Sequence, residues 1–558
     1  MIFDTFDGLT GDSHDVCIVG AGPVGISLAI ELERLGSSVL LIESGRRTAD
    51  SSIQKLSDAE IVSACVHHDM SIAVARRLGG TSNLWGARCL KFDPIDFLPR
   101  PGLVDVEWPI SYEELFPYYD RACEYTRSGA PVYKLPVPGV RVNEGSFTFE
   151  TLERWGNEQK LQVIHGRTLT KSKQIDVRLQ TTVVDISFHE DGRVNFIEIA
   201  RSDGTLRRRI PVRNLVIAAG GLESTRLLLA AQRQAPERFG GPDGPLGRHY
   251  MGHVTGEIAD IVFANPALDA AFDFFVDDHG SYVRRRFVPS GETQLCEQVL
   301  NVAMWPVVPP VADPRHGNGL LSLIYLSLAI GPIGRMIVAE AIRKRHIPEK
   351  PVNTVRHLEN VVRELPSALM LSADFLMCRY ARKTRIPGFF VRNKSFRYGL
   401  FYHSEQIPNP DSRVTLSGTL DRTGLPKLRV DLRFLDADAQ SVVRVHALFE
   451  NWLKLNGFGT LDYRVPVEER VAAVLAQARH GSHQIGTVRM ASSRRVGVVD
   501  HNLRSFDSPN LFVVSAAVLP TSGQASPTLT VIALAVRLAQ TLARASIVPV
   551  ATSSRKRG

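Results

Sequence analysis

The sequence predicts an α/β fold, α+β overall, in which a parallel-sheet domain is interrupted by a second, sheet-based domain with a helical insertion. Three observations predict it. Residues 15–45 have the pattern strand, helix, strand, and the segments 206–231 and 510–542 each repeat a buried strand followed by an apolar-periodic helix. Alternating patterns in 413–418 and 427–434 indicate strands of the second domain. A chain of 558 residues is also too long for one hydrophobic core.

The first unit, DVCIVGAGPVGISLAIELERLGSSVLLIESG, is expected to be a right-handed βαβ unit. Val16–Val19 and Val39–Ile42 are continuous apolar runs, as buried parallel strands are. Between them, apolar residues recur at helical spacing, and Gly36 is expected to end the helix.

The turn of this unit carries the pattern of a dinucleotide site. Gly20 permits the tight turn, Gly22 lets the backbone approach a pyrophosphate, and Gly25 lets helix and strand pack closely. Glu43, at the end of the second strand, is placed to accept hydrogen bonds from ribose hydroxyls. The complete unit therefore predicts an ADP-containing dinucleotide.

Cysteine usage and the N-terminus favour a reducing, cytoplasmic location. The six cysteines are scattered without ligand spacing, and MIFDTFDGLTGDSHD has neither a basic region nor an apolar region typical of a secretory signal. The most apolar run, residues 319–334, is shorter than the roughly 20 residues needed to span a bilayer. We expect it to form a buried strand or a core helix.

The positive charge is concentrated in one segment. Residues 335–397 contain 14 Lys and Arg against 5 Asp and Glu, whereas the whole chain has a net charge of only +8. A solvated helical lid is the plainest interpretation. An anionic membrane surface, an acidic partner or electron acceptor, and a negatively charged substrate remain alternatives. No nucleic-acid-binding module accompanies the charge, so we expect no nucleic acid.

Five motifs in order resemble the glucose-methanol-choline (GMC) oxidoreductases. They are GAGPVG (20–25), RLGGTSNLWGARC (77–89), HQIGTVRM (483–490), VVDHNLRSFDSPNLFVV (498–514) and PTLTVIALAVR (527–537). The pattern is closest to bacterial sugar dehydrogenases and pyranose oxidases. The resemblance covers about half of the chain, and implies a Rossmann-like FAD-binding domain and oxidation of an alcohol.

The resemblance assigns the catalytic residues. His483, in H-x-x-G-T, would take the hydroxyl proton as hydride leaves carbon for flavin N5, a task that suits a neutral imidazole. Ser526 stands where the family usually has Asn or His, so it is the expected second hydroxyl partner. His480 is expected to be structural. We expect no metal ion, because no third ligand accompanies the histidine pair in the sequence.

The resemblance also assigns the contacts to FAD. The loop with Gly80, Thr81, Asn83 and Leu84 would pass along the flavin ring. Pyranose oxidases have a histidine joined to the flavin at the position of Leu84, so FAD here is expected to be non-covalent. The remaining expected cofactor contacts are Val183, Gly220, Pro527 and Thr528.

These assignments predict a divided FAD-binding domain. Its N-terminal part is expected at 1–250, with the flavin-facing loop at 78–89, and its C-terminal part at 481–546. The substrate domain is expected at 251–480, with the basic helical insertion at about 330–397, and the tail 547–558 is expected to be disordered.

The predicted function is FAD-dependent oxidation of a sugar, glycoside or polyol CH–OH group. The electron acceptor (oxygen, a quinone or a protein) is left open. Two alternatives are a flavin monooxygenase that uses NAD(P)H, and an FAD-binding partner subunit that has lost catalysis.

Overall fold

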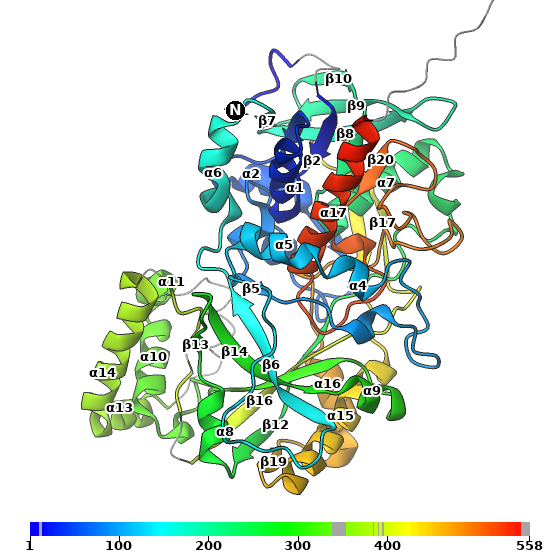
Figure 1. Ribbon diagram of the computed structural model, residues 1–558. Coiled ribbons are helices and arrows are strands. Elements are labelled where there is room, and N and C mark those ends of the chain that lie inside the picture. The colour runs from blue at the N-terminus through cyan, green and yellow to red at the C-terminus, as the bar shows by residue number, and fades with distance from the viewer. Residues whose placement is uncertain are drawn as a thin grey trace, which may run out of the picture.

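The computed structural model describes residues 1–9, 14–337, 347, 353–382, 384–388, 390–392 and 395–547. Figure 1 shows two halves, one built around β2, β7 and β20 and the other around β6, β12, β14 and β16. The predicted tail beyond residue 547 and part of the basic insertion lie outside the described residues.

A six-stranded parallel sheet forms the centre of the first half. Its strands, in spatial order, are β1 (Ile2–Phe3), β7 (Ile175–Arg178), β3 (Val39–Ile42), β2 (Val16–Val19), β11 (Leu215–Ile217) and β20 (Leu511–Val513). The N-terminal βαβ unit and both predicted returns of the chain therefore join one sheet, which confirms these expectations. Helix α1 (Pro23–Arg34) packs against α17 (Thr528–Ile547).

The glycine turn between β2 and α1 is held together by close backbone contacts. Gly20 has a φ of +106°, and a Cβ there would lie 2.6 Å from the Ala218 carbonyl oxygen. A Cβ on Gly25 would lie 1.9 Å from the Gly20 carbonyl oxygen. Gly22 differs, because a Cβ there would meet only the Gly80 Cα, at 3.9 Å. The fold therefore requires glycine at positions 20 and 25, whereas its own packing leaves room at position 22.

An antiparallel sheet forms the second half. Its main path runs through β19 (Gly459–Tyr463), β12 (Val254–Phe263), β16 (Arg397–Ser404), β15 (Val302–Val307), β14 (Tyr282–Pro289), β6 (Phe147–Trp155) and β5 (Arg88–Cys89). Phe449 and Trp452 of α15 (Asp436–Leu455) pack on Phe147 and Phe287 of this sheet. Because β5 and β6 precede residue 251, the sheet begins earlier in the chain than we expected.

A second expectation about this sheet is wrong. The alternating segments 413–418 and 427–434 do form strands, β17 (Arg413–Leu420) and β18 (Pro426–Asp431). They pair with each other and with β4 (Ala59–Ile61) in a separate three-stranded sheet. Alternation in a sequence indicates a strand with one buried face, but it does not identify the partner strand.

A small antiparallel sheet and a group of helices accompany the larger sheets. β8 (Thr181–Phe188), β9 (Val194–Arg201) and β10 (Arg207–Pro211) form an antiparallel sheet. The apolar run at 319–334 is helical, as one of our two alternatives predicted, and contributes α10 (Gly319–Ala329) and the start of α11 (Gly331–Ile337). With α13 (Thr354–Arg363) and α14 (Leu365–Leu376), these helices lie together at one side of the second sheet (Figure 1).

Among the described residues, no helix combines the length and apolar character that crossing a bilayer requires.

The glycine contacts predict different effects of two matched substitutions. Gly25→Ala should lower the melting temperature of the cofactor-free protein by at least about 3 °C, because the added methyl group overlaps the Gly20 carbonyl. Gly22→Ala should leave it within about 1 °C, because the methyl group would meet only the Gly80 Cα, at an ordinary contact distance of 3.9 Å. Thermal unfolding of both apo variants followed by circular dichroism tests this, and equal losses would contradict it.

Candidate active site and cofactor cavity

A cavity lies at the carboxyl ends of β2, β3 and β11, where parallel sheets of this kind bind their ligands. Seven of the predicted cofactor residues line it: Gly20, Gly22, Glu43, Gly80, Thr81, Val183 and Gly220. They come from five separate segments of the chain. The structure therefore brings together most of the set that we predicted.

The residues that line the cavity fit an ADP-containing dinucleotide. Gly22 caps α1 without any side-chain hydrogen bond, so the helix N-terminus offers free N–H groups where a pyrophosphate would lie. Position 22 lacks a Cβ although the protein has room for one, which keeps this part of the cavity open for a ligand. Glu43 accepts N–H groups from Ala21 and Gly45, at 3.0 and 2.8 Å, and this fixes its carboxylate at the cavity wall.

Five other predicted residues do not line this cavity. Gly25 supports the turn, and the Asn83 side chain donates to the carbonyls of Leu78 and Gly80, which holds the loop in shape. Leu84 is 48% exposed, and Pro527 and Thr528 lie at the start of α17. Their contacts to a flavin stay predictions.

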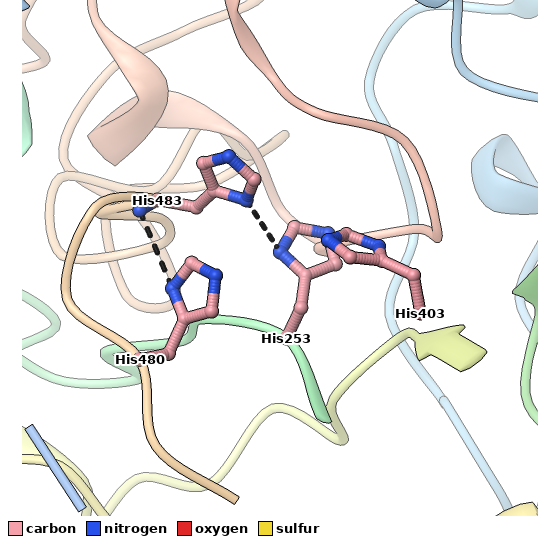
Figure 2. Close-up of side chains that lie close together, drawn as sticks. All are labelled: His253, His403, His480 and His483. Carbon is pink, nitrogen blue, oxygen red and sulfur yellow. Dashed lines mark hydrogen bonds between the residues drawn. The ribbon is translucent and has the colours of Figure 1, made fainter. Parts of the chain in front are cut away.

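Figure 2 shows a cluster of four histidines that come from three separate segments of the chain. His480 and His483 follow α16 (Arg470–Gln477), His253 precedes β12 and His403 lies on β16. Nδ1 of His483 lies 2.9 Å from Nδ1 of His253, and the His483 backbone N–H donates to Nδ1 of His480 at 3.4 Å. Nε2 is therefore the ring nitrogen of His483 that His253 leaves available.

His480 has a different place from His483. Its backbone N–H donates to the Val66 carbonyl, and its carbonyl accepts from the His68 N–H. These contacts attach the His483 loop to residues 66–68. The geometry agrees with the expected structural role of His480, which stays a prediction.

The environment keeps all four rings uncharged. Burial, as the largest cause, lowers the pKa of each histidine well below its ordinary value of 6.5. For His483 the positive charges of His253, when protonated, and Arg88 lower the pKa further. A neutral ring can accept a proton, so His483 is in the form that a general base needs.

The expectation of no metal ion rested on an argument that is wrong. We reasoned that no third ligand accompanies the histidine pair, but His253 and His403 do, and the ligand nitrogens of all four lie within 4.8 Å of one another. Two observations still disfavour a bound cation. Hydrogen bonds engage Nδ1 of every ring, and the Arg88 guanidinium disfavours positive charge at each. The absence of a metal stays a prediction.

Ser526 contacts an arginine that we did not predict. Nη2 of Arg88 donates to Oγ of Ser526 at 3.3 Å, and its Nη1 lies 3.4 Å from a carboxylate oxygen of Glu153. The Arg88 guanidinium lies over the Trp305 ring, and its side chain is 21% exposed. A guanidinium has five N–H groups, so the contacts to Ser526 and Glu153 leave Arg88 with donor groups for a ligand.

Gln524 connects the segment before α17 to the second sheet. Its carbonyl accepts Nδ1–H of His403 at 2.7 Å, and its side-chain oxygen accepts from Arg286 at 2.6 Å. Its side-chain nitrogen donates to Asp93 at 2.8 Å. These bonds determine where Ser526 lies relative to the histidines.

Sequence reasoning missed His253, His403 and Arg88. His253 directly precedes β12, His403 lies on β16, and neither belongs to a motif, so only tertiary structure reveals them. Arg88 is the second-to-last residue of the motif RLGGTSNLWGARC, and a cation beside a flavin-facing loop was a signal that could have been used. The cavity wall likewise includes Arg76, which pairs with Glu223 at 2.6 Å.

Comparison with known proteins agrees with this geometry. The family model of the GMC oxidoreductases matches residues 408–535, and that of an FAD binding domain matches residues 13–74. The chain is 22% identical to a 2-methyl-1,2-propanediol dehydrogenase of Mycolicibacterium austroafricanum, with 96% of each chain covered. It is 23% identical to a paromamine 6'-oxidase of Streptomyces fradiae, with 95% of this chain and 91% of that protein covered.

Among solved structures, pyridoxine 4-oxidase from Mesorbium loti has the same fold, with a TM-score of 0.52 and 17% identity, over 95% of this chain and 99% of that one. The motifs, the dinucleotide cavity and these matches lead to one conclusion. Residues 408–535 match the GMC oxidoreductases, residues 13–74 match an FAD binding domain, and the cofactor bound at the dinucleotide cavity is FAD.

Proposed function

We propose that the protein oxidises a hydroxyl group of a sugar, glycoside or polyol to the carbonyl, with His483 as the general base. The histidine–arginine site around Ser526 carries this proposal. The match of residues 408–535 to the GMC oxidoreductases supports the reaction class, and one relative is named for a diol. A flavin monooxygenase and a non-catalytic partner subunit are not favoured, because neither gives a role to an uncharged His483 whose ring is fixed by hydrogen bonds.

FAD fits the cavity between the glycine turn and Glu43, and when bound it supplies the acceptor for a hydride. Gly20, Gly22, Glu43, Gly80 and Thr81 are the residues that we propose hold it. Leucine at position 84 offers no nucleophile, so the cofactor is held without a covalent bond.

His483 acts through Nε2. In this proposal Nδ1–H of His483 donates to Nδ1 of His253, which leaves the lone pair of Nε2 free to take the substrate hydroxyl proton. His253 is thus a positioning residue, because it determines which His483 nitrogen carries the hydrogen. The lowered pKa keeps the base available below neutral pH.

Arg88 provides the second contact to the hydroxyl group. A serine at 526 has a shorter reach than the family's Asn or His, and Arg88 donates to its hydroxyl, so the guanidinium supplements Ser526 in this proposal. As the hydroxyl loses its proton, negative charge develops on the substrate oxygen. A guanidinium beside that oxygen stabilises this charge more than a neutral amide would.

The first prediction concerns the attachment of the cofactor. The purified protein should be yellow, and acid precipitation should release all the flavin into the supernatant, because Leu84 cannot form a covalent link. Absorbance spectra of pellet and supernatant give the answer. Flavin retained in the washed pellet would show that the cofactor is covalently attached.

The second prediction separates the two histidines of the H-x-x-H pair. His483→Ala should slow reduction of bound flavin by substrate roughly 10²–10⁴-fold, the usual contribution of a general base. His480→Ala is the matched control and should do much less. In wild type, the rate of flavin reduction should stay constant as the pH falls through 6.5, the ordinary pKa of histidine. It should fall only at lower pH, because the pKa of His483 is lowered and the ring becomes protonated only there. Anaerobic stopped-flow measurements across pH test both statements, and reversed effects would refute the assignment.

The third prediction tests Arg88 together with Ser526. Arg88→Met should slow flavin reduction about 10- to 100-fold, as expected for loss of a charge-assisted hydrogen bond. Ser526→Ala should cost only about two- to tenfold, because it removes a neutral hydrogen bond.

A double variant provides the control for this prediction. Ser526→Asn in the Arg88→Met background should recover part of the loss, since it restores the usual family side chain. In both Arg88 variants the buried Glu153 keeps Arg284 as its ion-pair partner, so the fold should be unchanged. The flavin content should therefore stay at the wild-type level. If Arg88→Met reduced its flavin as fast as wild type, Arg88 would have no role in the reaction.

A further inference from the structure

Strand β14 directs two arginines toward the active site. Side chains alternate along a strand, so Arg284 and Arg286 point to one face of the sheet and Arg285 points to the other. Arg286 donates to the side-chain oxygen of Gln524 at 2.6 Å. Because Gln524 lies two residues before Ser526, the face that carries Arg284 and Arg286 is the one that borders the proposed site of oxidation.

Arg284 and Arg88 lie over the same tryptophan ring. The central carbons of the two guanidinium groups are 4.9 and 5.1 Å from the centre of the Trp305 ring. That ring in turn lies 6.4 Å, centre to centre, from the ring of His403, a member of the histidine cluster. Stacking on an aromatic ring fixes the plane of a guanidinium without neutralising its charge. Both cations are therefore held in place beside the histidines.

Two more aromatic rings lie near Arg284. The central carbon of its guanidinium is 5.6 Å from the centre of the Trp155 ring and 5.1 Å from that of Phe274. Such rings exclude water, and the resulting low local dielectric strengthens the attraction between a cation and an anion. An anionic group beside Arg284 therefore gains more from this environment than a neutral hydroxyl group does.

Among the described residues, the carboxylates near these arginines do not satisfy all their donor groups. Glu153 accepts Nε–H of Arg284 at 2.7 Å, and its other oxygen lies 3.4 Å from Arg88, so two arginines share one carboxylate. The hydrogen bonds of Arg284 use Nε and Nη2, which leaves Nη1 without a partner within the described part of the chain. Nε of Arg286 is buried and likewise lacks a described hydrogen-bond partner.

The pKa values of the arginines reflect the same shortage of negative charge. Burial, as the largest cause, lowers the pKa of Arg286, and the neighbouring arginines lower it further, although Glu153 and Asp93 act against this. Burial also lowers the pKa of Arg284. The pKa of Arg100 is raised instead, although that arginine is buried too, because it pairs with a buried glutamate. A guanidinium remains charged in a protein, so the group around Arg284 can accommodate one more anion.

We propose that Arg284 binds a carboxylate of the substrate while Arg88 and Ser526 hold the reacting hydroxyl group. This inference rests on the proposed oxidation of a CH–OH group, and it narrows the substrate class to sugar acids and other hydroxy acids. Arg88, Arg284 and Glu153 together have one positive charge in excess. That excess matches a singly charged carboxylate better than a phosphate ester, whose charge is about −1.5 to −2.

Two matched pairs of compounds test this proposal. Glucuronate and glucose differ at one carbon, as do lactate and 1,2-propanediol, and in each pair a carboxylate replaces a CH₂OH group. Anaerobic calorimetry of the holoenzyme should show that at least one acid binds about tenfold or more tightly than its neutral counterpart, as expected for a charge-assisted hydrogen bond. Arg284→Met should reduce this preference to less than about twofold.

Three results of the calorimetry would overturn the proposal. The first is wild-type protein that prefers the acid in neither pair, which needs no variant to be established. The second is an unchanged preference for the acid in Arg284→Met. The third is tighter binding of glucose 6-phosphate than of either acid, which would assign the anion site to a phosphate ester instead of a carboxylate.

Two further variants distinguish recognition of an anion from support of the fold. Arg285→Met is the matched control, because it removes a positive charge of the same strand, equally buried but on the opposite face, and it should leave the preference for the acid unchanged. Glu153→Gln removes the carboxylate that offsets the arginines, so it should tighten binding of the acid at least about threefold. A purely structural role of Arg284 predicts no such gain, and weaker binding of the acid by Glu153→Gln would contradict the proposal.

The rate of flavin reduction separates this proposal from the oxidation on which it rests. Anaerobic stopped-flow absorbance with the same four compounds measures that rate independently of binding. If an acid bound preferentially but no hydroxyl compound reduced the flavin, the anion site would stand and the proposed oxidation would fail. If neutral polyols reduced the flavin and neither acid was preferred, the oxidation would stand and the anion site would fail.

Discussion

Gln524 is the contact on which the geometry of the active site depends. The segment before α17 belongs to the FAD-binding half, while His403, Arg286 and Asp93 come from other parts of the chain. One side chain and one carbonyl therefore set the distance between Ser526 and the histidine cluster. Three bonds to one residue restrict both translation and rotation of the segment. A catalytic arrangement shared by two sheets needs such a connection, because small displacements between reacting groups are costly.

The charges around the site follow a simple arrangement. Arg88 and Arg284 share the carboxylate of the fully buried Glu153, so the group has one excess positive charge. The histidines remain neutral beside it, because burial and that charge both oppose protonation. The site therefore has a lasting positive potential without a titrating cation. The same charge that stabilises a developing alkoxide makes His483 a weaker base, so the two effects partly offset each other.

Local features of the fold could be predicted from the sequence, and long-range ones could not. Val16–Val19, the glycine turn and α1 follow from short-range periodicity and from the backbone freedom of glycine. The pairing of β18 with β4 joins Arg429 to Glu60, which lie 369 positions apart in the chain, and alternation gives no signal for such a pair. His253 and His403 could not be predicted for the same reason. Only the register of the second sheet brings each of them to the site.

Gly22 and Gly25 meet two different requirements. Packing within the protein requires glycine at position 25, while position 22 is kept free for the ligand. A side chain at position 25 therefore acts on the protein itself, whereas a side chain at position 22 acts on whatever occupies the cavity. Two glycines of one motif thus report separately on folding and on cofactor binding.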